Sequence, residues 1–277
     1  MRHSIIDSHQ HFWKYDSVRD AWISDEMGVL KRDFLPEELH VIYTRHGIQG
    51  CVAVQADQSD NETKFLLSLS KQHDFIRGVV GWIDLKGKRL EEQLEAYSQE
   101  KKVKGFRHIV QAEPAGFLLD QAFQRGVKTL NRYGYTYDLL IYHHQLEEAA
   151  VFAAITEGTR MVVDHAAKPP IKNKERKGWK ESMKKLARFE NIFCKISGMV
   201  TEADWSHWTA DDLNPYLEDV FELFGASRIL YGSDWPVCLL AATYEQQLSI
   251  VLSFVERLSA DEKKRVLYEN AVRFYNL

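Results

Sequence analysis

Short apolar segments alternate with longer amphipathic segments along most of the chain, and this alternation constrains the fold more than any other feature. Eight segments have the length and apolar composition of β-strands: residues 4–7, 50–55, 76–83, 103–109, 135–142, 160–164, 192–196 and 228–231. Amphipathic stretches of helical length lie between and after them: residues 36–46, 61–73, 90–101, 118–133, 146–156, 179–189, 213–224 and 244–258. Strands that are rich in Val and Ile and apolar on both faces are typical of a parallel sheet covered by helices, so the alternation predicts an α/β fold.

The number of repeats favours a closed barrel over an open sheet. Eight strand and helix units within 277 residues predict a (β/α)8 TIM barrel, formed by one domain over residues 1–277. The alternative is a doubly wound open sheet, which would carry a Gly-x-Gly-x-x-Gly turn after its first strand. His9-Gln10-His11 stands there instead, and no stretch rich in Pro, Gly or Ser divides the chain.

Composition narrows the class of ligand. The formal charge is -4, with 36 basic and 40 acidic side chains, so the chain offers no broad positive field for nucleic acid or an anionic membrane. No apolar run approaches the roughly 20 residues of a membrane helix, and the start of the chain lacks the features of a signal peptide. Cys51, Cys194 and Cys238 lie in or just after apolar runs without close pairing, which predicts buried thiols. We therefore expect a cytoplasmic protein that acts on a small molecule; whether it forms a homo-oligomer stays open.

Polar side chains follow the predicted strands where each strand ends. In a barrel of this kind the reactive groups gather at the carboxyl ends of the strands. A single histidine there is more often a structural hydrogen-bonding group than a ligand, and an aspartate can equally cap a helix. Five strand ends would nevertheless meet at one mouth, and burying so many polar groups without a purpose is costly, so together they predict a site. These strand ends carry His9 and His11, Arg107 and His108, His143 and His144, Asp164 and His165, and Asp234 with Trp235.

Five motifs resemble those of the amidohydrolase superfamily, in the amidohydrolase-2 branch that contains sugar lactonases. They are the runs at residues 7–13 (DSHQHFW), 105–107 (GFR), 164–169 (DHAAKP), 231–236 (YGSDWP) and 270–275 (NAVRFY), and the resemblance spans essentially the whole chain. Within the branch the chain looks most like hydrolases of L-fuconolactone and L-rhamnonolactone. The resemblance implies a (β/α)8 barrel that hydrolyses a sugar lactone, with an aldonolactone as its small-molecule partner.

The resemblance also implies the ligands and catalytic groups. His9, His11 and Asp234 are expected to hold one divalent metal, zinc in some relatives, while other relatives work with none. Two-metal members carry a carboxylated lysine at the fourth strand, where this chain has Arg107 and His108, so one ion is the upper limit. The expected catalytic residues are Asp234, His165, His144 and Arg107.

These residues suggest a mechanism. Asp234 would take a proton from the attacking water, and a bound ion would polarise the carbonyl. Without an ion, the imidazoles and Arg107 would stabilise the oxyanion. His165 or a histidine of the fifth strand would then protonate the departing ring oxygen. His143 and His144 face opposite ways in a regular strand, and His144 shares the parity of Asp138 and Leu140, which favours His144.

Aromatic residues at strand ends and in long loops suit a sugar ring, because indole rings stack on its C–H faces. The expected substrate-binding residues are Trp13, Trp235, His108, His143, Lys168 and Trp82. The alternative is that several of these tryptophans only fill the top of the barrel. Two other functions also fit the fold: a zinc-dependent decarboxylase of an aromatic or enol acid, and a non-catalytic barrel that binds a sugar acid. In relatives of the decarboxylase type, the His-x-His pair is followed shortly by proline. In this chain Phe12-Trp13 follows the pair instead, which favours hydrolysis.

Overall fold

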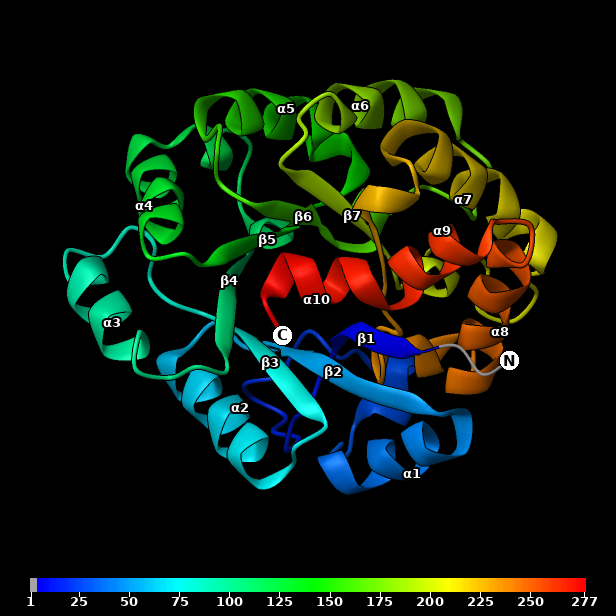
Figure 1. Ribbon diagram of the computed structural model, residues 1–277, viewed down its shortest axis with the longest axis horizontal. Coiled ribbons are helices and arrows are strands. Elements are labelled where there is room, and N and C mark those ends of the chain that lie inside the picture. Colours follow the sequence, from blue (N-terminus) through cyan, green and yellow to red (C-terminus); the bar gives the residue numbers. More distant parts are fainter. Residues whose placement is uncertain (1–3) are drawn as a thin grey trace.

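A computed structural model describes residues 4–277, so the first three positions of the predicted domain lie outside the described residues. In the described part, eight parallel strands follow one another in chain order, each paired with the next (Figure 1). The strands are β1 (Ile5–Gln10), β2 (Ile48–Val54), β3 (Ile76–Gly81), β4 (Val103–Ile109), β5 (Thr136–Leu140), β6 (Met161–Val163), β7 (Ile192–Ile196) and β8 (Ile229–Tyr231).

Two backbone hydrogen bonds join the last strand to the first. The N–H of Asp234 donates to the carbonyl of His9 at 2.8 Å, and the N–H of His11 donates to the carbonyl of Trp235 at 2.7 Å. Because these bonds bring residues beyond β8 against the end of β1, the sheet closes into a barrel. The predicted single-domain (β/α)8 TIM barrel is therefore confirmed.

Helices surround the strands as an outer ring (Figure 1). They are α1 (Pro36–His46), α2 (Asp60–Gln72), α3 (Leu90–Tyr97), α4 (Gln121–Arg132), α5 (Leu146–Ile155), α6 (Lys177–Ala187), α7 (Ala210–Phe224) and α8 (Tyr244–Val255). Two further helices follow in the chain, α9 (Ala260–Lys264) and α10 (Asn270–Tyr275), and α10 lies across the end of the barrel, inside this ring (Figure 1). The last two were not predicted. The side chain of Asp120 accepts from the N–H groups of Ala122 and Phe123, so α4 begins later than the predicted stretch.

The core has two parts because each strand is apolar on both faces. A large cluster fills the space between the sheet and the helices. A smaller cluster fills the inside of the barrel with side chains such as Ile6, Val52 and Val162, and Phe274 and Tyr275 of α10 belong to it.

The helix α10 lies at the amino end of the strands. Lys104, near the start of β4, donates to the carbonyl of Asn276 at 2.6 Å, and Arg160, just before β6, donates to the carbonyl of Phe274 at 3.2 Å. The opposite, carboxyl end of the strands is left for a site. Of the described helices, none is long and apolar enough to cross a membrane.

Candidate active site

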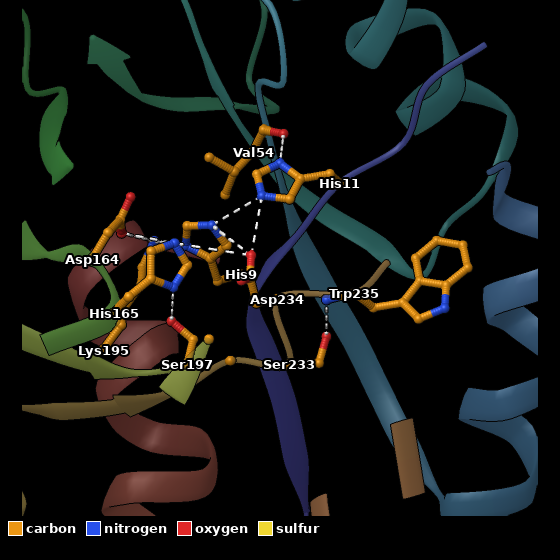
Figure 2. A network of polar contacts seen from close by, with 12 residues as sticks. His9, His11, Val54, Asp164, His165, Lys195, Ser197, Ser233, Asp234 and Trp235 are labelled. Atoms are coloured by element: carbon orange, nitrogen blue, oxygen red, sulfur yellow. Dashed lines mark hydrogen bonds and ion pairs between the residues drawn. The ribbon is translucent and has the colours of Figure 1, made fainter. Parts of the chain in front are cut away.

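Two histidines of the first strand meet the aspartate that follows the eighth. His9 is fully buried and His11 is 5% exposed. Their Nε2 atoms lie 3.2 Å apart, and Oδ1 of Asp234 lies 3.8 Å from Nε2 of His9 and 3.4 Å from Nε2 of His11 (Figure 2). The structure therefore brings together the three residues predicted as metal ligands.

Asp7 and Gly232 set this close approach. Oδ1 of Asp7 accepts from the backbone N–H of His9 at 3.2 Å and from that of Ser233 at 2.9 Å, which joins β1 to the segment carrying Asp234. A Cβ on Gly232 would lie 2.7 Å from Cβ of His9, so only glycine lets the two segments pack this tightly.

A left-handed turn after β6 carries His165. Its Nε2 lies 3.9 Å from Oδ1 of Asp234, and its Nδ1 lies 2.9 Å from Oγ of Ser197. His165, Ala166, Ala167 and Lys168 all have positive φ, from 48° to 57°. Such a conformation costs a non-glycine residue roughly 1–2 kcal/mol, so the surrounding packing must impose it. The turn brings a third imidazole to Asp234.

A network of buried charges lies beneath the imidazoles. Nζ of Lys195 is 2.5 Å from Oδ2 of Asp138, 2.9 Å from Oδ1 of Asp164 and 3.1 Å from Nδ1 of His9. Nη1 of Arg107 lies 3.1 Å from Oδ2 of Asp164 and 3.3 Å from Nε2 of His9. Oδ1 of Asp164 also lies 3.3 Å from Nδ1 of His9, so one lysine, one arginine and one carboxylate contact this imidazole.

The pKa values follow from burial and from these neighbours. Burial lowers the pKa of His9 well below its usual range and that of His165 to about 4, so both rings resist protonation. Burial opposes ionisation of Asp164, but Lys195, His9 and Arg107 outweigh it and hold the pKa of this carboxyl well below its usual range. Asp138 differs, because burial raises its pKa to about 6 although Lys195 opposes the shift.

The residues around Asp234 fit a divalent ion. Burial opposes ionisation of Asp234 too, but His165, His11 and His9 hold its pKa below its usual range. Among residues 4–277, the ion pairs of Asp234 involve imidazoles, and no lysine or arginine pairs directly with this carboxylate. Tetrahedral zinc with bonds of about 2.0–2.1 Å separates its ligand atoms by roughly 3.3 Å. The separations among His9, His11 and Asp234, from 3.2 to 3.8 Å, are close to that value.

A cavity of about 460 Å³ opens above these groups. Its size is in the range of small-molecule sites. The polar and aromatic side chains that line it include His11, Arg107, His165, Lys168, Asp234, Gln58, Gln111, Tyr142, Trp13 and Trp22. Of the residues predicted to be catalytic, Asp234, His165 and Arg107 reach this cavity, and of those predicted to bind substrate, Trp13 and Lys168 do.

The fifth-strand histidines lie elsewhere, which corrects the parity argument for His144. The strand β5 ends at Leu140, and His143–Gln145 forms a single 3-10 turn. His144 is exposed and stacks on Tyr142, while Nδ1 of His143 lies 3.0 Å from the carbonyl of Lys168. Neither ring lines the cavity. The error arose because the alternation of a strand does not continue past its last residue.

Three further residues predicted to bind substrate also lie outside the cavity lining. Trp235 is fully buried and packs edge to face on Phe34, and Figure 2 shows its ring directed away from the imidazoles. His108 packs edge to face on Phe123 of α4 and lies 2.8 Å from Glu113, because it alternates with the inward-facing Arg107. Trp82 is partly buried, and its backbone carbonyl accepts from Thr63. For Trp235, the alternative that tryptophans fill the top of the barrel therefore holds.

Sequence reasoning missed Lys195 and Asp138. Both lie inside strands, not at strand ends, and both are fully buried. The available signal was one charged residue within an otherwise apolar strand, as in Ile192–Ile196. Such a residue is expensive to bury unless it is paired, so it points to a partner inside the barrel.

Comparison with known proteins finds one matching family model and two similar proteins that share a name. The family model described as Amidohydrolase matches residues 6–277. An L-fucono-1,5-lactonase of Burkholderia multivorans is 40% identical over 284 residues, covering 98% of this chain and 96% of that protein. An L-fucono-1,5-lactonase of Burkholderia ambifaria is 33% identical over 277 residues, covering 98% of this chain and 95% of that protein.

One solved structure matches in fold as well as in sequence. It is an amidohydrolase from Burkholderia multivorans with bound zinc, 38% identical, with a TM-score of 0.96 over 99% of both chains. The match of the family model over nearly the whole chain, together with relatives above 30% identity, agrees with the barrel and with the cluster at its carboxyl end. The chain belongs to the amidohydrolase family.

Proposed function

We propose that this protein hydrolyses a sugar lactone, an aldonolactone of the L-fuconolactone type, by attack of water on the ring carbonyl. The observation that carries the proposal is the convergence of three imidazoles on Asp234 at the floor of the cavity. The similarity to two L-fucono-1,5-lactonases supports the substrate class.

Asp234 is the base in this reaction. Its carboxylate stays ionised because its pKa is held below its usual range, and it lines the cavity where water and lactone meet. It accepts one proton from the attacking water. The guanidinium of Arg107, held by Asp164 and by the carbonyl of Gln55, stabilises the negative charge that develops on the carbonyl oxygen.

Zinc is the metal that we propose for His9, His11 and Asp234. The two nitrogen ligands and one carboxylate oxygen match the donors that this ion takes in catalytic sites, which leave a position open. A bound zinc ion would polarise the carbonyl and lower the pKa of water. The zinc-bound structure of a similar amidohydrolase supports this choice of metal.

Side chains of the cavity wall bind the sugar. Trp13, whose Nε1 donates to the carbonyl of Arg32 at 2.9 Å, packs edge to face with Trp22, and both line the cavity. Such rings suit the C–H face of a sugar. The amides of Gln58 and Gln111 lie on the same wall and suit its hydroxyl groups.

A pH-indicator screen of aldonolactones tests the proposal. We expect acid release from L-fucono-1,5-lactone, and we expect Asp234→Asn to lower kcat about 10²- to 10⁴-fold, the usual contribution of a general base. Asp204→Asn, at an aspartate whose side chain is 46% exposed and which does not line the cavity, is the matched control and should keep full activity. Silence on every lactone, with carbon dioxide released from a panel of aromatic and enol acids, would instead identify the decarboxylase alternative.

A further inference from the structure

Opening a lactone requires a second proton besides the one that Asp234 takes. When the bond between the carbonyl carbon and the ring oxygen breaks, the ring oxygen keeps the electron pair and becomes an alkoxide. An alkoxide is a much stronger base than an amine, so a nearby acid must give it a proton as it departs. This question rests on the proposed lactone hydrolysis, and it concerns which side chain supplies that proton.

The three imidazoles are turned toward the cluster. Each Nε2 faces Oδ1 of Asp234, at 3.8 Å for His9, 3.4 Å for His11 and 3.9 Å for His165. Their Nδ1 atoms contact Lys195, the carbonyl of Val54 and the hydroxyl of Ser197 respectively. Both nitrogens of each ring thus face protein groups: Nε2 faces Asp234, and Nδ1 contacts Lys195, Val54 or Ser197.

Other residues of the wall are poor proton donors. Arg107 keeps its proton under all ordinary conditions, and amides and indoles do not act as acids in water. Tyr142 also lines the cavity, but it is 39% exposed and its ring stacks on the exposed His144. Lys168 remains, and it lines the same cavity as Asp234.

Several contacts fix the position of Lys168. It ends the left-handed turn that begins at His165, with φ 49°, and its N–H donates to the carbonyl of His165 at 2.8 Å. Its Nζ lies 2.6 Å from Oε1 of Glu202, and its side chain is 16% exposed. His143 lies 3.0 Å from its carbonyl, so the neighbouring strand end also holds the turn. Strain of this kind persists where function requires a fixed geometry.

We infer that Lys168 is the general acid, which protonates the departing ring oxygen of the lactone. Asp234 takes one proton from water, and the hydroxyl oxygen bonds to the carbonyl carbon. The bond from that carbon to the ring oxygen breaks, its electron pair stays on the ring oxygen, and Nζ of Lys168 gives this oxygen a proton. Lys168 regains a proton from solvent, while Asp234 and the new carboxylic acid release theirs.

Electrostatics keep this lysine charged before the reaction. Burial alone would lower the pKa of Lys168, but Glu202 and Asp234 outweigh it and raise the pKa above its ordinary value. The ammonium is therefore present at neutral pH. Transfer of its proton to an alkoxide remains downhill, because the alkoxide is the stronger base.

Two substitutions separate proton donation from charge. Lys168→Met removes both, and Lys168→Arg keeps a positive charge that cannot be transferred. On L-fucono-1,5-lactone we expect both variants to lose kcat by 10²- to 10⁴-fold, with KM changed less than threefold. Lys172→Met, at an exposed lysine nearby in the chain, is the matched control and should match the parent protein. Circular dichroism and thermal unfolding confirm that each variant is folded, and Lys168→Gln serves if Lys168→Met is not.

The outcomes are distinct. Recovery of kcat in Lys168→Arg would assign a purely electrostatic role and overturn the inference. A rise in KM with unchanged kcat would show that Lys168 only binds substrate, which would overturn it too. If the parent protein itself opens no lactone, the proposed function fails, whereas an active parent with an equally active Lys168→Met refutes only the general acid.

Discussion

At the scale of single residues, one glycine sets the contact between two site groups that lie far apart in sequence. Gly198 has φ 59°, and a Cβ there would lie 2.6 Å from Nδ1 of His165 and 2.7 Å from Oδ2 of Asp234. Both contacts are far below any real Cβ separation, so the imidazole or the carboxylate would have to move. The absence of one methyl group lets the third imidazole reach Asp234.

Gly198→Ala should therefore damage catalysis more than stability. We expect kcat on a sugar lactone to fall at least about 10²-fold, since displacement by 1 Å can cost this much. The left-handed φ should also cost about 1 kcal/mol of unfolding free energy. Gly134→Ala is the control, because Gly134 has φ 78° but no atom within 4 Å of its Cβ position. Urea unfolding and steady-state kinetics on both variants test this; equal kinetic losses in the two would contradict the steric argument.

A site residue can be predicted from the sequence when it lies at the end of its strand, but not when it lies within the strand. Five predicted site residues lie at strand ends, where a polar residue after an apolar run can be recognised in the sequence. The structure brings these five together: His9, His11, Arg107, His165 and Asp234. Lys195 and Asp138 sit within strands, where their pairing depends on the barrel closing around them. Trp235 is adjacent to Asp234, but adjacent residues point in different directions, so its ring packs in the core.

At the scale of elements, strand positions were predicted well and their ends less well. The bounds of β4, β7 and α1 agree with prediction. The helix α1 has a proline at its first position and ends before the left-handed Gly47, and the polar Asn191 and Ser197 flank β7. The turn after β5 and the left-handed turn after β6 were not predictable, since they depend on packing between neighbouring strand ends and not on local preference. The short helix α10 was missed although its motif was noted, because its apolar side chains find their partners only inside the finished barrel.

The helix α2 carries a buried acid that should make stability depend on pH. Glu62 lies in its first turn, is 5% exposed, and accepts from the N–H of Ala56 at 2.9 Å. Burial raises its pKa from 4.5 to about 7. Between these two values the folded protein keeps a proton that the unfolded chain has lost, so this residue lowers stability as pH rises from 4.5 to 7 and has a constant effect above that range.

Glu62→Gln should remove this pH dependence while keeping the acceptor for Ala56. Relative to the parent protein, we expect the variant to gain roughly 2–3 kcal/mol of unfolding free energy between pH 5 and pH 8. Urea unfolding at the two pH values measures it. Glu95→Gln, on the exposed side of α3, should show no such gain. Parallel stability curves for Glu62→Gln and the parent protein would show that the buried carboxylate is not the cause.

At the scale of the whole molecule, polar contacts inside the barrel connect the helix at its amino end to the site at its carboxyl end. Tyr275 of α10 donates to Oδ2 of Asp138 at 2.7 Å, and the same oxygen pairs with Lys195, which contacts His9. A continuous chain of polar contacts thus runs from the helix at the amino end of the strands to the imidazoles at the carboxyl end. The site rests on the packed interior of the barrel and not on surface loops alone.

The proposed metal ligands come from the first and last strands, so a bound ion should stabilise the closed barrel as a whole. His9 and His11 belong to β1 and the residue after it, whereas Asp234 follows β8. An ion that binds only the folded state at 100 times its Kd adds about 2.7 kcal/mol to the unfolding free energy. We expect zinc, added to chelator-treated protein, to raise Tm by several degrees. His11→Ala should abolish this rise, and His207→Ala, at a histidine whose side chain is 84% exposed, should retain it. An equal rise in Tm in the parent protein and both variants would place the ion at another site. Zinc would then not stabilise the barrel by joining its first and last strands.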